Sequence, residues 1–252
     1  MKNRRVKGFY LLLSSVFLTL LQLPFSIAKS AAGSKMHIKT SVHDSDAVNM
    51  FLNPEVIEGD RSVYDSLHLS LKGLSKEAYE YAKKGLEYLL EKGEKLSSSV
   101  ISIIDFSLPS NQKRLFVIDL ENYRLLFNTY VAHGRNTGRE WATSFSNQSQ
   151  SYKSSPGFYK TAETYQGKNG YSLKLEGLER GINDNAYNRG IVIHGAEYVS
   201  QSLANAQGYI GRSQGCPAVP VQVSRPIINT IKDGSVVFIY HPSYISRSAL
   251  LN

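Results

Sequence analysis

The amino-acid sequence predicts a mainly β domain, a small barrel or sandwich with short helices, preceded by a helical extension. Short runs rich in β-branched and aromatic residues alternate with glycine-rich turns from residue 115 to residue 240, a pattern typical of sandwiches and barrels. Upstream, apolar residues recur at helical spacing between Leu74 and Gly93. A chain of 252 residues can bury a full core. We therefore expect one main domain with an appended helical segment.

The first 28 residues are predicted to be a secretory signal peptide. A basic start at Lys2–Lys7 precedes the almost wholly apolar run Phe9–Leu23, and Ser26 and Ala28 offer small residues for cleavage. An uncleaved membrane anchor is the alternative, because Phe9–Ala28 approaches the roughly 20 residues that span a bilayer. We favour cleavage, which predicts an exported protein of the periplasm or cell envelope with no stable membrane insertion.

The charge balance of the exported chain is mildly positive. The whole chain carries a net charge of +8, and the loss of four basic residues with the signal peptide leaves about +4. No basic run marks a nucleic-acid binder, so we expect no nucleic-acid partner. A modest positive balance suits an acidic wall polymer. Nothing in the sequence points to a particular oligomeric state.

Residues 29–60 are predicted to form a linker or loosely ordered arm, because Ser, Lys, His and Asp are mixed there with little periodicity. His37 and His43 with Asp44 are of the residue types that bind metal ions. They lack a third ligand at helical or hairpin spacing, so solvated histidines are the better interpretation. We expect neither a metal nor another cofactor.

The helical extension is expected to begin its main helix at Ser75. The Ser75 hydroxyl can accept from free N–H groups of the first turn, Glu77 favours the positive end of the helix dipole, and Gly93 is a natural stop. Ser97–Phe106 is rich in Val and Ile and predicts a strand. The turn at Pro109–Asn111 then leads into the main domain.

The main domain is expected to open with a β-hairpin, Leu115–Leu120 and Leu125–Val131. The polar segment Trp141–Ser154 predicts a flexible surface loop near a cleft entrance. Further strands are predicted at 157–161, 172–176, 190–193 and 235–240, and short helices at 199–205 and 227–231.

Two residues of the main domain indicate nucleophilic chemistry. His194 follows three β-branched residues and precedes Gly195, which predicts an imidazole where a buried strand ends. Cys216, the only cysteine, lies in a turn framed by Gly215 and Pro217. A thiol needs a nearby base or positive field to become a nucleophile, and His194 can serve if the strand end meets the turn. The hypothesis is a Cys–His acyl-transfer site, against the alternative of a buried, inert thiol.

This pattern resembles the L,D-transpeptidase catalytic domain family, the YkuD-like murein L,D-transpeptidases, whose signature is a histidine followed by Ser/Thr-His-Gly-Cys. Here His194 is followed after 18 residues by Ser213–Cys216. The family's earlier Thr-Pro-x-Gly-x-Phe/Tyr-like turn is loosely matched by Ser155–Tyr159. Gln214 replaces the usual second histidine, and Ala218 stands where many members carry Arg or Asn. These departures suggest a divergent exported branch.

The resemblance implies a division of the chain and a class of substrate. We expect a signal peptide at 1–28, a linker at 29–60, a helical extension at 61–110, an L,D-transpeptidase-like catalytic domain at 111–242 and a C-terminal tail at 243–252. The implied substrate is the peptide stem of peptidoglycan. The implied enzyme is a cysteine acyltransferase that resolves its acyl-enzyme with an amine or with water.

The resemblance also implies roles for the catalytic residues. Cys216 would attack the stem carbonyl, and His194 would take the thiol proton. The carbonyl of Gly195 would fix the imidazole tautomer, Ser213 would brace the loop, and N–H groups around Gly215 and Cys216 would hold the oxyanion.

Three further residues are expected to contact substrate. Arg212 is a candidate partner for a substrate carboxylate, although exposed arginines are often simply solvated. Gln214 lies at the motif position where this sequence differs from the family signature. His133, in a second His-Gly pair, is either a cleft residue or a loop-end donor.

Three alternative functions remain at this stage. A hydrolase, either an L,D-carboxypeptidase or a wall-protein amidase, would use the same Cys–His pair. A non-catalytic wall-binding relative would keep the fold without activity. A zinc hydrolase would use His133, His194 and an acid such as Asp184 as ligands.

Overall fold

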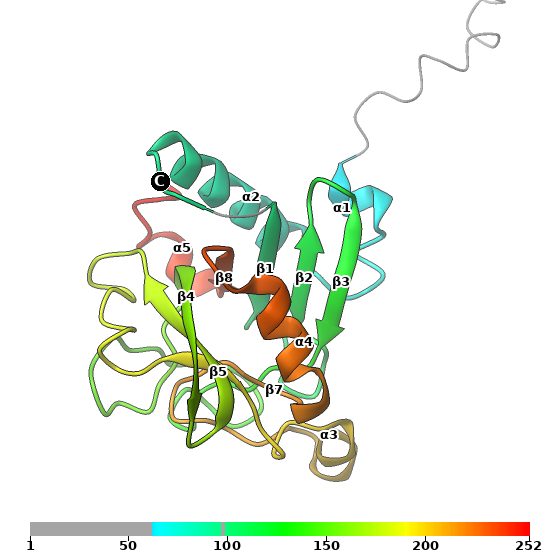
Figure 1. Ribbon diagram of the computed structural model, residues 1–252. Coiled ribbons are helices and arrows are strands. Elements are labelled where there is room, and N and C mark those ends of the chain that lie inside the picture. The colour runs from blue at the N-terminus through cyan, green and yellow to red at the C-terminus, as the bar shows by residue number, and fades with distance from the viewer. Residues whose placement is uncertain (1–61, 97–98) are drawn as a thin grey trace, which may run out of the picture. The chain divides into compact units, whose positions relative to one another are not determined.

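Eight strands form one sheet within the described part of the chain, which is residues 62–96 and 99–252 of the computed structural model (Figure 1). Their bounds are Val100–Asp105 (β1), Leu115–Asp119 (β2), Arg124–Thr129 (β3), Gly157–Gly167 (β4), Gly170–Gly177 (β5), Val192–Gly195 (β6), Ala218–Val219 (β7) and Val236–Tyr240 (β8). Their order across the sheet is β3-β2-β1-β8-β4-β5-β6-β7. The predicted signal peptide (1–28) and linker (29–60) lie outside the described residues.

The sheet curls into a nearly closed barrel. An isolated bridge joins Ala132, which follows β3, to Ala218 in β7, so the two outermost strands approach each other. Two pairings are parallel, β1 with β8 and β6 with β7, and the others are antiparallel. The prediction of a mainly β barrel or sandwich with short helices is confirmed.

The strand predictions hold with changes in length. The hairpin of β2 and β3 is confirmed, with Leu115 opposite Thr129. β4 and β5 extend beyond the predicted strands, and the turn between Gly167 and Gly170 joins them as a long hairpin. The residues of β4 after Thr161 are exposed or only partly buried, and their largely polar sequence did not predict a strand.

Five helices lie among the described residues: Val63–Ser66 (α1), Lys76–Glu91 (α2), Gln201–Gln207 (α3), Val221–Ile231 (α4) and Pro242–Ile245 (α5). The predicted start of α2 is confirmed, because the Ser75 hydroxyl accepts from the N–H of Ala78 at 3.1 Å. α4 begins six residues before the predicted helical turn at 227–231 and contains Pro226 in its interior. No helix in the described ranges is long and apolar enough to cross a membrane.

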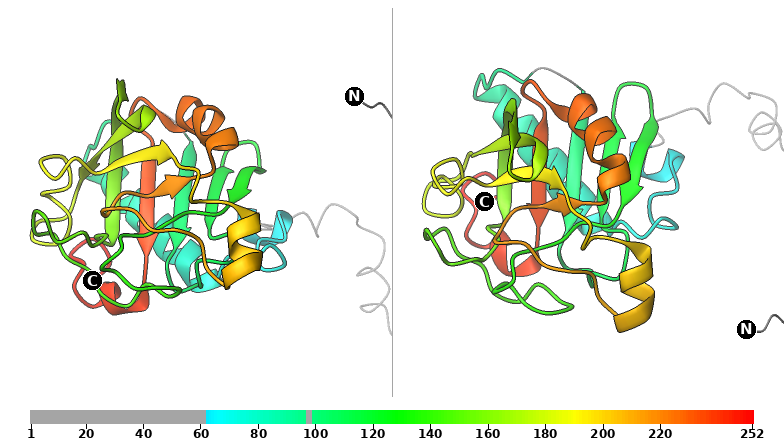
Figure 2. Two further views of the ribbon diagram at one scale, coloured as in Figure 1. Left: turned by 90° about the horizontal axis from the view of Figure 1, so that it is seen from below. Right: turned by 60° about the horizontal axis from the view of Figure 1, so that its bottom comes forward.

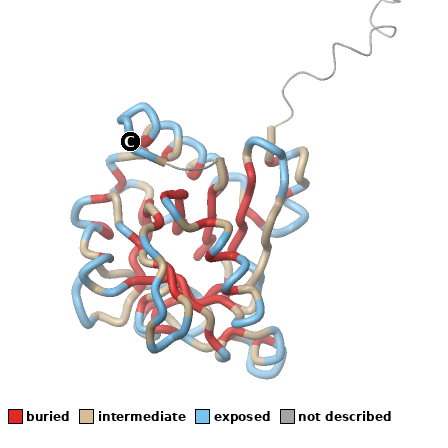
Figure 3. Tube along the Cα trace, viewed as in Figure 1, coloured by how far each residue is buried: buried red, intermediate tan, exposed pale blue. Residues whose placement is uncertain are grey.

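The core has three clusters, and the two larger ones lie on opposite faces of the sheet. On one face α2 packs against β1 and β8, with Ile101, Ile103 and Phe238 in the same cluster. On the other face α4 packs against β1, β5 and β6 (Figure 2). β1, β2 and β8 are buried nearly throughout, and these strands are largely red in Figure 3. Strands that are covered on both faces have nearly continuous apolar sequences, and β1, β2 and β8 show this pattern.

Two predicted boundaries divide segments that the fold joins. β1 belongs to the predicted extension 61–110, yet it pairs with β2 and β8 in the middle of the sheet. The separation at residue 110 is therefore wrong, because it would remove a central strand. The predicted tail 243–252 is also packed. Tyr244 and Ser248 donate from their hydroxyls to the buried carboxylate of Glu179, and Leu251 is buried in the core.

A glycine in α2 permits close packing of that helix on the sheet. A Cβ added at Gly85 would overlap the ring of Phe158, which is fully buried in β4. Gly85→Ala is expected to lower the free energy of unfolding by about 1–3 kcal/mol through overpacking, although alanine favours a helix by about 1 kcal/mol over glycine. Urea unfolding followed by circular dichroism measures the change.

The matched control for this prediction is Phe158→Leu, alone and combined with Gly85→Ala. Because the smaller side chain makes room, the two changes together should cost less than the sum of the single changes. A Gly85→Ala variant more stable than the wild type would contradict the packing described.

Candidate active site

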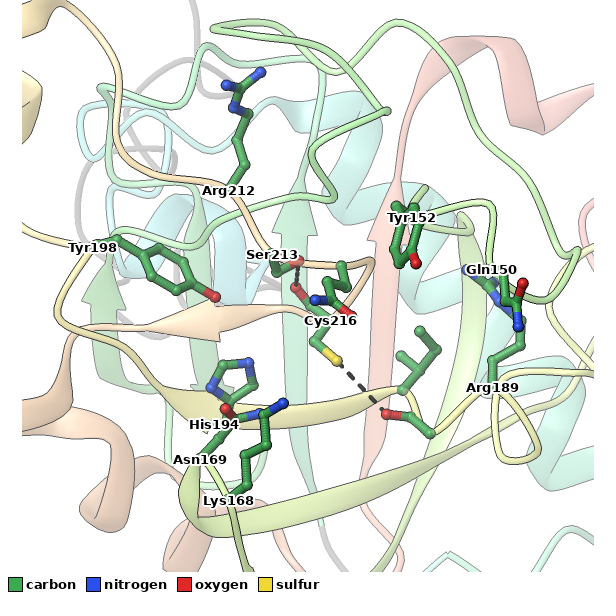
Figure 4. Close-up of a pocket in the computed structure, with 13 residues that line it drawn as sticks. Gln150, Tyr152, Lys168, Asn169, Arg189, His194, Tyr198, Arg212, Ser213 and Cys216 are labelled. Atoms are coloured by element: carbon green, nitrogen blue, oxygen red, sulfur yellow. Dashed lines mark hydrogen bonds between the residues drawn. The ribbon is translucent and has the colours of Figure 1, made fainter.

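The site lies in a pocket of about 460 Å³ that is lined by both Cys216 and His194 (Figure 4). Its walls come from four segments that are distant in the sequence. They are residues 150–152, the tip of the β4–β5 hairpin at 168–169, residues 189–198 around β6, and the cysteine turn at 212–216. The side chains of Cys216 and His194 both point into this space. The predicted meeting of strand end and turn is therefore present.

The parallel pairing of β6 with β7 explains this proximity. His194 lies opposite Ala218, and Gly195 opposite Val219. Cys216 precedes Ala218 by two residues, so parallel register places it level with Val192, two residues before the histidine. The Cys216 thiol accordingly lies 3.7 Å from the carbonyl oxygen of Gly190, near the start of the same strand.

The cysteine turn is held by hydrogen bonds of small side chains. The Ser213 hydroxyl donates to the carbonyl of Cys216 at 2.7 Å and accepts from the N–H of Gly215 at 3.0 Å. The Ser154 hydroxyl donates to the carbonyl of Gly215 at 3.1 Å. Gly215 has φ of +124°, a region that favours glycine. Ser213 thus braces the loop through contacts of the kind expected for it.

His194 is held in one tautomer. Its side chain is nearly buried, and its Nδ1 lies 2.9 Å from the carbonyl oxygen of Gly195. A carbonyl oxygen can only accept, so Nδ1 carries the proton and Nε2 keeps a lone pair. An imidazole in this state can accept a proton from a thiol.

Burial favours the uncharged forms of both groups. Burial lowers the pKa of His194 below its usual value, although the contact with the Gly195 carbonyl raises it in part. Burial raises the pKa of the Cys216 thiol, while the backbone N–H of Val192 and the positive charge of Arg189 lower it in part. The resting pair is therefore a thiol beside a neutral imidazole.

His133 is not in the pocket. Its side chain has no exposed surface, its Nδ1 accepts from the guanidinium of Arg114 at 2.8 Å, and its Nε2 donates to the carbonyl of Gly138 at 3.2 Å. Burial and the neighbouring Arg114 lower its pKa to about 3. The prediction that His133 is a cleft residue is wrong, and the alternative of a loop-end donor fits its contact with Gly138.

The three ligands of the zinc alternative are not grouped. His133 is fully buried, and Asp184 accepts from the side chain of Asn147 and the N–H of Gly181. Among the described residues, no three His, Cys, Asp or Glu side chains form a group that could hold a metal ion. The zinc hydrolase reading is therefore wrong for this set of ligands.

Arg212 and Gln214 both line the pocket and are exposed. Arg212 makes one long contact, 3.4 Å from its Nη1 to the carbonyl oxygen of Gly138. Its side chain extends away from the sulfur along the pocket rim (Figure 4). Roles in substrate binding remain predictions for both residues.

Several side chains that line the pocket were not predicted from the sequence to belong to the site. Arg189 stands just before β6, Tyr198 follows it, and Tyr152 and Lys168 come from the loop and the hairpin tip. Arg189 had one available signal, a cation directly preceding the apolar run that ends at His194.

Comparison with known proteins finds solved structures of low identity, and no curated protein matches the chain. L,D-transpeptidase 3 from Mycobacterium tuberculosis is similar, with 14% identity and a TM-score of 0.36 over 58% of this chain and 63% of that chain. An L,D-transpeptidase from Mycobacterium smegmatis has 11% identity and a TM-score of 0.37 over 57% of this chain and 60% of that chain. The helical cell shape determining protein Pgp2 from Campylobacter jejuni has 14% identity and a TM-score of 0.39 over 67% of this chain and 57% of that chain.

In each case the match spans less than two thirds of the length of the relative. The comparison with protein families is more extensive, because residues 70–240 match the L,D-transpeptidase catalytic domain. The matched range includes β1 to β8 and the whole pocket. The chain belongs to the L,D-transpeptidase catalytic domain family.

Proposed function

We propose that the protein is a peptidoglycan-modifying cysteine acyltransferase of the L,D-transpeptidase type, with Cys216 as nucleophile and His194 as base. The observation that carries the proposal is the shared pocket. The sole thiol and a histidine with its Nε2 lone pair available line the same cavity. A nucleophile and a correctly oriented base are the two parts that covalent acyl transfer needs.

The reaction begins when Cys216 attacks a carbonyl carbon of the peptide stem. The thiol proton passes to Nε2 of His194 as the S–C bond forms, and the same proton is then given to the leaving amine as the C–N bond breaks. The product is a thioester on Cys216. An acceptor amine then attacks the thioester, forms a new amide and returns the thiol.

The developing oxyanion needs donors near the sulfur. The N–H of Gly215 is engaged by the Ser213 hydroxyl at 3.0 Å, so this group stabilises the turn. The N–H of Cys216 is the remaining candidate of the expected pair. Removing one such donor costs about 3 kcal/mol of transition-state stabilisation in comparable enzymes.

The charge of the pocket suits an anionic stem. Lys168, Arg189 and Arg212 all line it, and its lining contains no Asp or Glu. Focused positive potential raises the local concentration of a carboxylate-bearing substrate. Arg212 is exposed and therefore able to pair with a stem carboxylate, with Gln214 beside it as a neutral hydrogen-bonding group. The proposal includes peptidoglycan as the partner and the cell envelope as the location.

Replacing the nucleophile is the first test. Cys216→Ala and the near-isosteric Cys216→Ser should each lower acyl transfer on tetrapeptide stems by more than about 10³-fold, because the covalent route is lost. Mass spectrometry of muropeptides, with and without an added amine, measures the product. Thermal unfolding should show that both variants remain folded.

The outcome also distinguishes the alternatives. New amide product that requires the amine supports transpeptidation, whereas cleaved product without the amine assigns a hydrolase. Peptidoglycan binding without any turnover assigns a wall-binding relative. Turnover at the wild-type rate in Cys216→Ala overturns the site assignment.

The pH dependence provides a second test. His194 must be neutral to accept the proton, and burial lowers its pKa below the usual 6.5. Activity is therefore expected to persist below pH 6.5 and to fall as the pH drops through the lowered pKa. The acidic limb of kcat/KM measures this midpoint. Titration of the imidazole by NMR in Cys216→Ala assigns it to His194, and a midpoint above pH 7 in both measurements contradicts the buried, neutral base.

A further inference from the structure

Arg189 connects the pocket to the loop that borders it. Its guanidinium is half-buried and makes four contacts, all with one short segment. Nη1 donates to the carbonyl of Ser146 at 2.9 Å and to the hydroxyl of Ser155 at 2.6 Å. Nη2 donates to the carbonyl of Lys153 at 2.6 Å and to the hydroxyl of Ser151 at 3.4 Å. The planar fork thereby holds the loop segment 146–155 at four points.

The same guanidinium lies against the cysteine turn. A Cβ placed on Gly215 would stand 3.3 Å from Nη2 of Arg189 and 2.8 Å from the carbonyl oxygen of Lys153. The missing side chain of Gly215 is what allows the loop segment and the guanidinium to come this close. Cys216 is the next residue, and it lines the same pocket as Arg189.

The charge of Arg189 is not neutralised by a carboxylate. The ion pairs among the described residues involve Lys83, Lys174 and Lys232, and Arg189 is in none of them. Its contacts are to carbonyl and hydroxyl oxygens, which satisfy its N–H groups without cancelling its charge. A half-buried cation in this state acts on any negative charge formed nearby.

We propose that Arg189 is a positioning residue of the cysteine site, which clamps the segment 146–155 onto the Gly215–Cys216 turn and holds an unpaired positive charge beside the thiolate as it forms. This deepens the proposed function and rests on Cys216 being the nucleophile. Arg189 and Arg212 have different proposed roles. All four hydrogens on Nη1 and Nη2 are engaged within the protein, whereas Arg212 is exposed at the rim.

Other titratable groups line the same pocket as the sulfur. His194 approaches from β6, Tyr198 from the segment after it, Lys168 from the hairpin tip, Tyr152 from the loop and Arg212 from the start of the cysteine turn. Burial raises the pKa of the thiol, and the charge of Arg189 acts in the opposite direction. Loss of that charge is expected to leave less thiolate at any pH below the pKa.

The test is the rate of iodoacetamide alkylation of the full chain between pH 6.5 and 9.5, where the sole cysteine makes the labelled site unambiguous. Arg189→Gln should alkylate roughly tenfold more slowly at pH 8, because a nearby opposite charge shifts a pKa by about one unit or more. Arg189→Lys keeps the charge and should stay within about threefold of the wild type. The matched control is Arg247→Gln, which removes one exposed arginine that does not line this pocket.

Hydrogen exchange provides the readout for the clamp. Backbone amides of 146–155 should exchange faster in both Arg189 variants and not in Arg247→Gln, because neither glutamine nor lysine reproduces the fork. If Arg189→Gln is folded by thermal unfolding and alkylates at the wild-type rate, the charge role is overturned. If Arg189→Gln does not fold, Arg189→Lys provides the test of the charge role. Because lysine keeps the positive charge, a tenfold loss of alkylation rate in that variant overturns the charge role.

Unchanged exchange at 146–155 in a folded Arg189 variant overturns the clamp. A wild-type thiol that iodoacetamide does not label in the native protein counts against the proposed function itself. That result is separate from any difference between the variants and the wild type.

Discussion

The site depends on the parallel register between β6 and β7. This two-strand contact is short, yet it decides where the thiol lies with respect to the imidazole, because His194 faces Ala218 and the cysteine stands two residues earlier. A shift of one residue would turn every side chain of β7 to the other face of the sheet. Ser213, Ser154 and Gly134 support the register from the turn side through hydrogen bonds and a further bridge. The geometry of the proposed catalytic pair is therefore a property of the sheet as much as of the two residues.

Burial and nearby positive charge have separate effects on the ionisation of the groups in the pocket. Burial keeps the resting thiol and imidazole neutral, which avoids the cost of holding an isolated ion pair away from water. The cations around the pocket then favour the negative charge that appears when the proton moves. A neutral thiol and imidazole surrounded by cationic side chains are consistent with general-base catalysis, in which the proton leaves as the sulfur attacks.

Much of this could be predicted from the sequence, and the failures have physical causes. The Ser75 cap and the β2–β3 hairpin follow from local patterns, so their predictions hold. The first half of α4 was missed because Pro226 lacks an N–H and disfavours a helix interior, while burial of Ile227, Ile228 and Ile231 stabilises the helix despite it. β1 was assigned to an appended segment because its partner β8 lies more than a hundred residues later.

The residues of the site likewise include some that could be predicted from the sequence and some that could not. His194 and Cys216 stood out because their types and flanking glycines are informative by themselves. The burial of His133 and its contact with Arg114, the residue directly before β2, could not be foreseen from the local sequence. Arg189 was missed for the same reason, because its importance lies in contacts with a loop some 40 residues earlier in the chain.

The position of β8 has a consequence for how the protein folds. β8 is the last strand in the chain, yet it pairs with β1 on one side and with β4 on the other, so it joins the β1–β3 half of the sheet to the β4–β7 half. Apart from β8, the backbone bridges that join the two halves among the described residues are the isolated pairs Ala132–Ala218 and Gly134–Ser213. Such late, long-range pairing slows folding relative to proteins built from local contacts. The barrel therefore closes only after residues near 240 have joined the sheet, and the proposed nucleophile and base gain their rigid support at that step.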